Sequence, residues 1–540
     1  MLLPHFHDRK LVLLLFVFFF LINIISSGGH LDWWDGTEAF LVTESMVSKN
    51  TAKLDPFVPS VKELGFNVNY TVYANNAMQS RSNANLSNTT LEPVYTVRSL
   101  LLSAVGVPFY LSGLLMNISP FLTIGLLVNT LILSLTSLSI FCISIEVHQS
   151  RKIAFVLGLI FSVCSFVWPY INSFWVQPLQ ALILSSSLLF ILKVQHYDKS
   201  YLCSYTVKYG RKRFYFSALS GFLLGLSVFA HPISLIFIPA FLVYTFFRVM
   251  RHDIKNFLLL VSLIALMLFF VGLVNYARFG SFTDFGYGYF SSLAAHDGWR
   301  GLIGLLVSPG VGLIFFFPIA VLLPLGAIYM YKDNRALFFL CIYIIIANWI
   351  YIGTLSYGAE PSSWSGGIAW GPRYLIPVMP FIMIVLGSIF LHLRRRRILK
   401  AIVISLCLVG FYVNLSGILI WFQYGLMYGW YVERLATSPN YMETMTWSPA
   451  YSTIVLQTKA MLADYVSSIN PEQYIGTSLS WAAYGNAPCS YDLYLYCNFG
   501  VGPVLVISLI LVFLAALILD RIGFSQLSYS KYYRRFVRSS

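Results

Sequence analysis

Charged residues are scarce in this chain of 540 residues, and acidic residues are scarcer than basic ones. Asp, Glu, Lys and Arg make up 10% of the sequence, whereas a soluble protein carries roughly 25%. Hydrophobic residues make up 58%. This composition excludes an ordinary water-soluble protein. Because a backbone that crosses lipid must satisfy its own hydrogen bonds, helices are favoured, and we predict an all-α polytopic membrane protein.

Long apolar runs without charge recur from one end of the chain to the other. A span needs about 20 such residues, and the runs predict about twelve spans, within a range of roughly 11–13. The run at 98–116 contains two glycines and a proline, so we predict that it is interfacial or re-entrant. The predicted spans lie at 11–27, 120–144, 152–171, 173–193, 214–230, 232–249, 256–275, 309–330, 336–354, 374–392, 399–421 and 501–520.

The few charges are distributed unevenly between the two sides of this map. With the N-terminus inside, the inner segments carry 25 Lys/Arg and 6 Asp/Glu, and the outer segments carry 10 and 15. Basic residues gather on the cytoplasmic side of a membrane, so we predict a multi-pass protein of the cell membrane with both termini cytoplasmic. The net charge of +14 is then a topology signal. No nucleic-acid partner is predicted, because no basic patch is interleaved with stacking aromatics in a soluble domain.

The span map also predicts how the chain is organised. We expect a transmembrane catalytic region at 1–421, which includes a long outer loop at 28–97 bearing short interfacial helices. A second outer loop follows at 422–500, then the last span at 501–520 and a basic cytoplasmic tail at 521–540. A cleaved signal peptide is the alternative for the first run, but no small-x-small cleavage site stands out before the first outer loop, which favours a retained span.

The outer loops carry signs of an extracytoplasmic location. Three N-glycosylation sequons begin at Asn69, Asn85 and Asn88, and such sequons act only on that face. Cys489 and Cys497 share the last outer loop. An oxidising exterior favours a disulfide between them, although two free thiols fit the sequence equally well. No Cys/His spacing is typical of a zinc site.

The stretch SGGHLDWWDGTEAF gathers acids where the chain leaves its first span. Asp32, Asp35 and Glu38 are candidate catalytic residues, because a carboxylate at the mouth of a membrane cavity suits a general base. Taken alone, these acids fit an interfacial role better, with Trp33 and Trp34 as belt aromatics. A further alternative is a divalent cation held through the oxygens of these acids, Asp32 and Asp35 first. No other cofactor is predicted.

A second candidate motif, WSGGIAWGPRYLIPVMPF, begins at Trp364. Arg373 is the only basic residue of the outer loop before it enters a span, and its guanidinium suits bidentate capture of a phosphate. Trp364 and Trp370 could stack on a sugar or line a lipid groove, and Tyr374 follows the arginine directly. The alternative is an interfacial arginine that meets lipid headgroups.

Two further residues are candidates for substrate contact. His231 lies in a tight outer turn before a proline, where it could donate to a phosphate, carry a proton or serve as an ordinary turn histidine. Glu360 lies in the loop that ends at Arg373, and could assist catalysis or pair with a neighbour.

The order of these features resembles the large family of GT-C membrane glycosyltransferases, above all the branch of the protein O-mannosyltransferases and aminoarabinose transferases. The resemblance covers most of the chain. It depends on one span followed by an acidic outer loop and many spans. It also depends on three phrases: Trp-x-Gly-Gly-x-x-Trp-Gly-Pro-Arg-Tyr-Leu-x-Pro at 364–377, Ser-Pro-Gly-x-Gly-Leu at 308–313 and Asn-Tyr-x-x-Phe-Gly-Ser at 275–281.

The resemblance implies a GT-C-like bundle that takes a sugar from a polyprenyl-phosphate carrier. It passes the sugar to an acceptor on the outer face with inversion at the anomeric carbon. An Asp of the first outer loop is the expected base, and the Ser45-Met46-Val47 phrase downstream points to Asp35 rather than Asp32. The family often has a second acid directly after this Asp, where this chain has Gly36, so the role of Glu38 stays open.

The resemblance also suggests how the leaving group is stabilised. The departing lipid phosphate needs a fixed positive charge, for which Arg373 is the candidate. The family often has Arg where His231 stands, so a phosphate contact there stays open. The expected partners are therefore a polyprenyl-phosphate-linked sugar, an unidentified acceptor and the bilayer.

Two rival classes fit the sequence less well. The Trp-Trp-Asp-Gly string is similar to an oligosaccharyltransferase signature, but it lacks the Tyr and lies in the first loop rather than in a C-terminal soluble domain. A transporter or lipid flippase is the remaining alternative. Transporters often have internal repeats and charges at mid-membrane, and neither is evident in this sequence.

Overall fold

The structure is a computed structural model. It describes residues 9–31, 35–55, 57–60, 94–204, 207–250, 253–286, 298–354, 363–367, 369–393, 396–433, 441–463 and 491–524. Over these ranges the regular structure is helical, and the only β contact is an isolated bridge between Leu54 and Val94.

Eight of the described helices are long and apolar enough to cross a membrane. The prediction of an all-α, multi-pass membrane protein is confirmed, and the number of about twelve spans stays a prediction. The eight are α6 (Pro120–His148), α8 (Val176–Ser204), α9 (Val207–Ala230), α11 (Ile254–Phe279), α15 (Arg335–Gly353), α16 (Met379–His392) with the 3-10 helix Arg373–Val378 before it, α17 (Arg397–Leu419) and α24 (Val501–Phe524).

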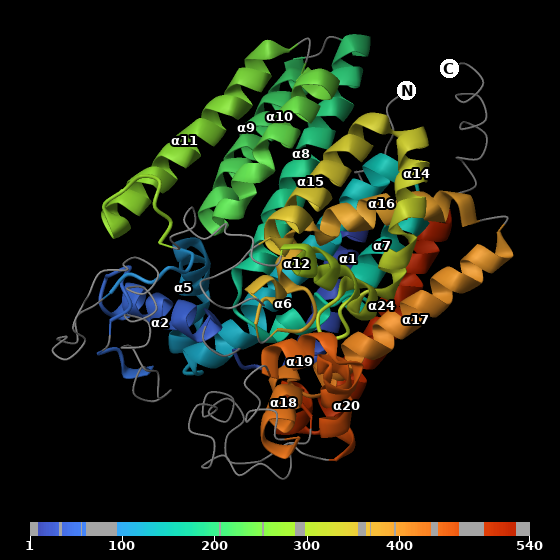
Figure 1. Ribbon diagram of the computed structural model, residues 1–540. Helices are drawn as coiled ribbons and strands as arrows, with labels where there is room; N and C mark the ends of the chain where they lie inside the picture. Colours follow the sequence, from blue (N-terminus) through green and yellow to red (C-terminus); the bar gives the residue numbers. More distant parts are fainter. Residues whose placement is uncertain are drawn as a thin grey trace.

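Shorter helices complete the bundle in Figure 1. α16 lies at its centre, where it packs against α6, α14 and α15. Every residue of α16 from Met379 to Ile389 is buried, as expected for a helix that is hydrophobic all round. The shorter helices are α1 (Arg9–Ile25), α7 (Arg151–Val163), α10 (Ile238–Thr245), α12 (Gly298–Val307), α13 (Leu313–Phe316) and α14 (Leu323–Asp333).

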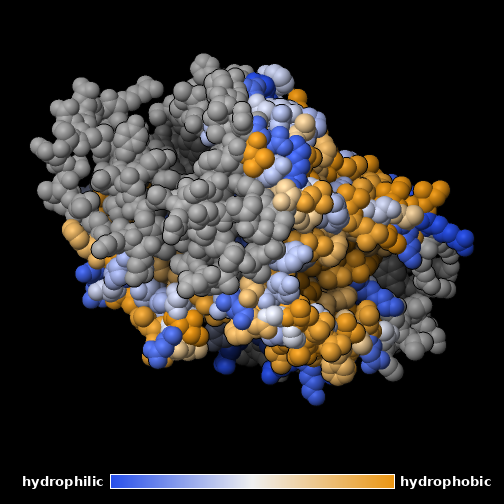
Figure 2. All heavy atoms as spheres, turned by 90° about the horizontal axis from the view of Figure 1, so that it is seen from below, coloured by the Kyte–Doolittle hydropathy of each residue, from blue (hydrophilic) through white to orange (hydrophobic). Residues whose placement is uncertain are grey.

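The flank of the bundle is apolar. Leu505, Leu509 and Phe513 of α24 are each more than half exposed, as is Leu408 of α17. Figure 2 shows hydrophobic residues spread over a broad area of the visible surface. Contiguous apolar surface of this kind is unfavourable in water and marks contact with other apolar matter, here the lipid chains of a bilayer.

Both ends of the described chain lie on the same side of the bundle. The backbone N–H of Tyr494 donates to the carbonyl of Ser27, which brings the start of α24 beside the end of α1. Leu11 and Ile522, at the opposite ends of these two helices, belong to one buried cluster. α1 and α24 are therefore antiparallel neighbours. This arrangement agrees with the predicted topology, and the cytoplasmic side itself stays a prediction.

Short helices gather at the other end of the bundle. Figure 1 shows α2 (Asp35–Ser48) and the group α18 (Phe422–Met427), α19 (Tyr441–Trp447) and α20 (Thr453–Leu462) at its lower end. These helices come from the two segments that the sequence predicts to be outer loops. A last short helix, α23 (Tyr494–Phe499), leads into α24.

The run at 98–116 forms α5 (Leu100–Leu115), with Pro108 inside it. Its 16 residues rise about 24 Å, which is less than the roughly 30 Å core of a bilayer. The helix packs against α2 and α6. The contact with α2 is close because the facing residues are small: Ser103 Oγ donates to the Ala39 carbonyl, and Thr43 Oγ1 donates to the Ser103 carbonyl.

Candidate active site

The candidate base Asp35 is the first residue of α2. A carboxylate is favoured at a helix N-terminus by the helix dipole. Glu38 follows three residues later, and this spacing puts both carboxylates on one face. The Asp35 side chain is 22% exposed, whereas the Glu38 side chain is only 8% exposed.

Two arginines meet at the Asp35 carboxylate. Arg98 lies just before α5, and its Nη2 is 2.6 Å from Oδ1 of Asp35. Its Nε donates to Oε2 of Glu38 over 3.2 Å, so one guanidinium bridges both acids. Arg373 approaches from the other side, with Nη1 3.4 Å from Oδ2 of Asp35. The structure therefore brings together Asp35, Glu38 and Arg373 from the predicted set, and it adds Arg98.

The Arg373 guanidinium is held by aromatic rings. It lies 4.4 Å from the ring centre of Trp175 and 4.9 Å from that of Tyr374, and its Nη2 donates to the Tyr374 hydroxyl over 3.1 Å. Cation–π contacts of this kind fix the plane of an arginine. Gly366 (φ +84°) lies against the same side chain, and a Cβ at this position would be 2.9 Å from Arg373 Cγ. Only glycine suits both this backbone conformation and this close approach.

Arg98 is also positioned by its surroundings. The guanidinium of Arg278, near the end of α11, donates to the carbonyls of Thr96 and Arg98, the latter over 3.0 Å. Ser99 Oγ donates to the Phe229 carbonyl at the end of α9 over 3.1 Å. Arg278 lies at one of the two unspecified positions of the 275–281 phrase, and it holds the backbone that carries Arg98.

The electrostatics of the site follow from burial next to two arginines. Burial raises the pKa of Glu38 above its usual range, although Arg98 opposes this shift. His231 lies in the turn between α9 and α10, where its Nδ1 accepts from the backbone N–H of Ile233. Burial first, and then the charges of Arg98 and Arg373, lower its pKa from 6.5 to about 4. His231 is therefore neutral at pH 7 and lies within the field of both arginines.

The two tryptophans of the 364–377 phrase point into the protein. Trp370 is fully buried, and its indole N–H donates to Oδ1 of Asn414 over 3.0 Å. Trp364 is 3% exposed and packs against Trp447. Both side chains therefore anchor the glycine-rich loop that carries Arg373. Their predicted contact with a sugar stays a prediction.

Several predicted site residues lie outside the described part of the chain. Cys497 is disulfide-bonded, and its predicted partner Cys489 is among the residues outside. Within the described ranges no group of three His, Cys, Asp or Glu side chains could hold a metal ion. The divalent cation stays a prediction, because one of its predicted ligands is not described. The residues outside are Asp32, Trp33, Trp34, Asn69, Asn85, Asn88, Glu360 and Cys489.

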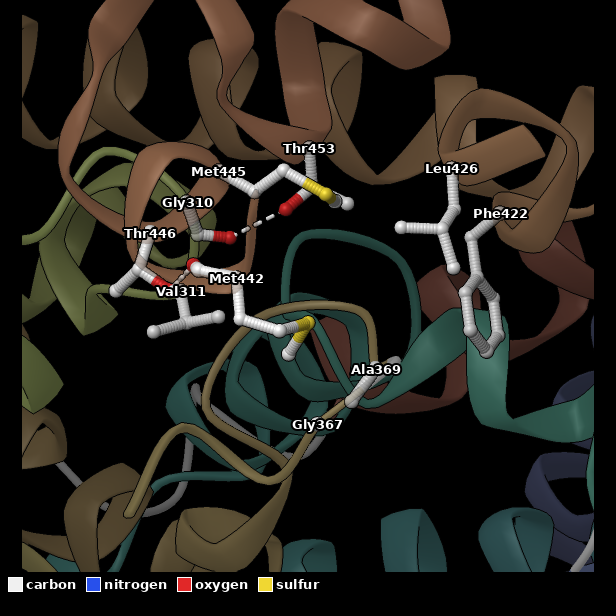
Figure 3. Close-up of a pocket in the computed structure, with 10 residues that line it drawn as sticks. All are labelled: Gly310, Val311, Gly367, Ala369, Phe422, Leu426, Met442, Met445, Thr446 and Thr453. Carbon is white, nitrogen blue, oxygen red and sulfur yellow. Dashed lines mark hydrogen bonds between the residues drawn. The ribbon is translucent and has the colours of Figure 1, made fainter. Parts of the chain in front are cut away.

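A small apolar pocket lies near the loop that carries Arg373, and Figure 3 shows its lining. Met442 and Met445 face Phe422 and Leu426 across it. Thr453 Oγ1 already donates to the Gly310 carbonyl. The free space is about 20 Å³, room for little more than one water molecule. This pocket is therefore too small to hold a sugar or a lipid chain in the observed conformation.

Sequence reasoning missed two residues of the site. Arg98 is the first residue of the run at 98–116 and its only basic one, which was a usable signal. Trp175 gave no signal, because it is one of many aromatic residues near the ends of predicted spans and lies within the span predicted at 173–193. It can be identified only from the ring that lies under Arg373.

No protein-family model matches the sequence, and neither does any curated protein. Among solved structures, the chain is similar to ArnT from Cupriavidus metallidurans bound to undecaprenyl phosphate, with 14% identity, a TM-score of 0.42 and coverage of 91% of this chain and 76% of that one. It is also similar to the oligosaccharyltransferase of Archaeoglobus fulgidus tethered with an acceptor peptide, with 12% identity, a TM-score of 0.44 and coverage of 81% and 58%. This chain thus spans little more than half of that oligosaccharyltransferase. A shared fold does not define a function, which depends on the side chains of the site.

Proposed function

We propose that this chain is a GT-C-like membrane glycosyltransferase. It moves a sugar from a polyprenyl-phosphate carrier to a hydroxyl acceptor on the extracytoplasmic face, with inversion at the anomeric carbon. Asp35 is the proposed general base, and Arg373 is the proposed stabiliser of the leaving phosphate. The division of the chain into a catalytic region at 1–421 and an outer loop at 422–500 is part of the same proposal.

One observation carries the proposal: the Asp35 carboxylate lies between the guanidinium groups of Arg98 and Arg373. A carboxylate can accept a proton from an alcohol, and two guanidinium groups can bind a phosphate. These are the two functions that transfer from a phosphate carrier requires. The arginine that faces the carrier is fixed by two rings, that of its chain neighbour Tyr374 and that of Trp175, just before α8.

The reaction follows as a single displacement. The acceptor hydroxyl gives its proton to Asp35 as its oxygen bonds to the anomeric carbon. The bond between that carbon and the phosphate oxygen breaks, and the electron pair leaves with the polyprenyl phosphate. Arg373 and Arg98 stabilise the charge that develops on the phosphate in the transition state.

The resting structure also implies an order of events. Both oxygens of Asp35 are engaged by arginines, Oδ1 by Arg98 and Oδ2 by Arg373. Each oxygen that could accept a proton from the acceptor hydroxyl is thus already partnered by a guanidinium N–H. The donor phosphate competes for the same guanidinium groups. We therefore expect the donor to bind first and to free Asp35 for the acceptor hydroxyl.

The test is a transfer assay in membranes that contain the full chain. Polyprenyl-phosphate donors with different sugars are supplied with a mixture of glycan, lipid and protein acceptors, and the anomeric configuration of each product is determined. A product with inverted configuration, formed only with the chain present, is the expected result.

A product that retains the donor configuration would contradict the single displacement. Movement of a labelled solute or lipid across proteoliposomes, without sugar transfer from any donor, would favour the transporter or flippase instead.

A further inference from the structure

A buried polar cluster joins the first predicted outer loop to the last one. His30 Nε2 lies 2.8 Å from Oδ1 and 2.9 Å from Oδ2 of Asp492. Asn172, which ends the 3-10 helix Trp168–Asn172, donates from Nδ2 to Oδ2 of Asp492 over 3.1 Å. The His30 side chain is 0% exposed and that of Asp492 is 2% exposed. Neither side chain can touch a substrate, so any effect on the reaction must act through other residues.

Two hydrogen bonds and one ring contact hold this cluster in place. The N–H of Asp492 donates to the carbonyl of Leu419, the last residue of α17, over 2.7 Å. The N–H of Gly28 donates to Oδ1 of Asn172 over 2.7 Å. The Trp421 ring lies 4.8 Å from that of His30 and excludes water from one side. The segment before Asp35 is thus fixed by a residue 462 positions away in the chain.

The glycines of this segment are required by the cluster. A Cβ on Gly28 would lie 2.1 Å from Oδ1 of Asp492 and 2.8 Å from Nε2 of His30. Gly29 has φ +73°, a conformation that favours glycine. A Cβ on Gly125 of α6 would lie 2.9 Å from the carbonyl of His30. The opening "SGGH" of the acidic stretch is therefore shaped to let the Asp492 carboxylate reach the histidine.

We propose that Asp492, His30 and Asn172 form a clasp by which the C-terminal outer loop positions the catalytic loop. The three are positioning residues, and the inference rests on the proposed role of Asp35, which lies five residues after His30 in the chain. Residues 26–31, between α1 and α2, are all buried. The clasp holds this connection, and with it the start of α2. The phosphate side of the site has other supports, because Arg373 is fixed by Trp175 and Tyr374.

Because Asp35 and Arg373 are positioned by different contacts, we expect loss of the clasp to change kcat but not the donor KM. When the clasp is broken, Asp35 shifts relative to the acceptor hydroxyl, and small displacements of a base lower turnover strongly. The contacts of Arg373 with its two aromatic rings are unchanged, so donor binding is preserved. A purely structural residue would instead lower the amount of folded protein without separating kcat from the donor KM.

Two variants of the full chain break the clasp in different ways. Asp492→Asn keeps the shape and removes the charge, whereas Gly28→Ala keeps the charge and displaces the carboxylate. Gly502→Ala is the matched control, because no atom lies within 4 Å of the Cβ that it adds. A swapped double variant, His30→Asp with Asp492→His, tests whether a pair of the opposite orientation restores the contact.

Two measurements are made on each variant in membranes. Hydrogen exchange of peptides covering 26–40 is expected to accelerate about tenfold in Asp492→Asn and Gly28→Ala, with no change over 369–393. The kcat of sugar transfer is expected to fall about tenfold, with the donor KM within about twofold of wild type. The swapped double variant is expected to recover part of both losses.

The outcomes separate this inference from the proposed function. Unchanged exchange over 26–40 in both variants would overturn the clasp, whatever the chain catalyses. Faster exchange with an unchanged kcat would overturn the positioning role while leaving Asp35 as the base. If the wild type transfers no sugar, the proposed function fails, and the exchange measurement still decides whether the clasp exists.

Discussion

The role of Arg373 can be tested by a substitution, because the expected fall in kcat can be estimated from the position of its guanidinium. The guanidinium lies 3.4 Å from the Asp35 carboxylate, and its side chain is only 13% exposed. Two unit charges about 4 Å apart attract each other by about 4 kcal/mol at an effective dielectric constant of about 20. The donor phosphate carries one negative charge before the transfer and close to two afterwards. Only the charge that develops in the transition state counts towards turnover.

We take the developing charge to be between one half and one full unit, which makes the catalytic contribution of Arg373 roughly 2–4 kcal/mol. A loss of about 2.7 kcal/mol corresponds to a factor of about 100 in rate. We therefore expect Arg373→Gln to lower kcat about 100-fold. Arg373→Lys keeps the charge but loses the planar fork and the ring contacts with Trp175 and Tyr374, so we expect a smaller fall of about tenfold.

The assay measures initial rates of sugar transfer at saturating donor, with the amount of folded protein determined for each variant. Arg300→Gln is the matched control, because Arg300 pairs with Glu443 where both side chains are about a third or more exposed. Exposed ion pairs contribute little, and its rate should stay within about twofold of wild type. An Arg373→Gln enzyme within about threefold of wild type would refute the leaving-group role.

Three further predictions follow from the site and its supports. Arg98→Gln frees one Asp35 oxygen and removes one phosphate ligand, so the donor KM should rise and kcat should fall about tenfold; steady-state kinetics that match wild type would contradict this. The pKa of His231 is lowered in the folded protein from 6.5 to about 4. Between pH 7 and pH 5 this histidine therefore becomes protonated in the unfolded chain but stays largely neutral in the folded one, so the free energy of unfolding should fall by about 2 kcal/mol. Thermal unfolding in detergent at both pH values checks this, and His231→Asn should remove most of the loss. Trp370→Phe leaves the Asn414 acceptor without its indole donor, and should cost about 1–3 kcal/mol of stability with turnover unchanged; an unchanged unfolding temperature would count against it.

The class of fold was predictable because a bilayer leaves few choices. Low charge and long apolar runs require helices in a membrane. The uneven distribution of Lys and Arg predicts which end of each helix is cytoplasmic. The prediction that the loops around Asp35, His231 and Arg373 lie on one side agrees with the structure, in which Arg373 pairs with Asp35 and its charge also acts on His231. The run at 98–116 could be distinguished from the transmembrane spans, because its two glycines and its proline are unfavourable in a regular transmembrane helix.

The details of the site were less accessible to sequence. Arg98 meets Asp35 where α2 and α5 pack closely through small residues such as Ser103 and Thr43. A pattern of single residues does not indicate such a contact across about 60 positions of chain. The sequence also did not indicate that the Trp370 side chain points into the core. Its loop turns through Gly366 and Gly371, both with positive φ, and these turns direct the indole into the core.

The clasp shows a third kind of limit. His30 stands within the acidic stretch and was visible in the sequence, but its partner Asp492 is 462 positions away. Histidines and aspartates at such a separation have no pattern that links them. The two glycines before His30 were a local signal of close packing, although they do not show what packs there.

The central claim is that the Asp35 carboxylate accepts the proton of the acceptor hydroxyl. The most direct measurement compares sugar transfer by the wild type, Asp35→Asn and Asp35→Glu at saturating donor, with donor binding measured on the same membranes. Loss of a general base lowers rates about 10²–10⁴-fold, so Asp35→Asn should lose at least about 100-fold of turnover and still bind the donor through Arg373. Asp35→Glu should retain a small part of the activity. Turnover by Asp35→Asn close to that of the wild type would contradict the account.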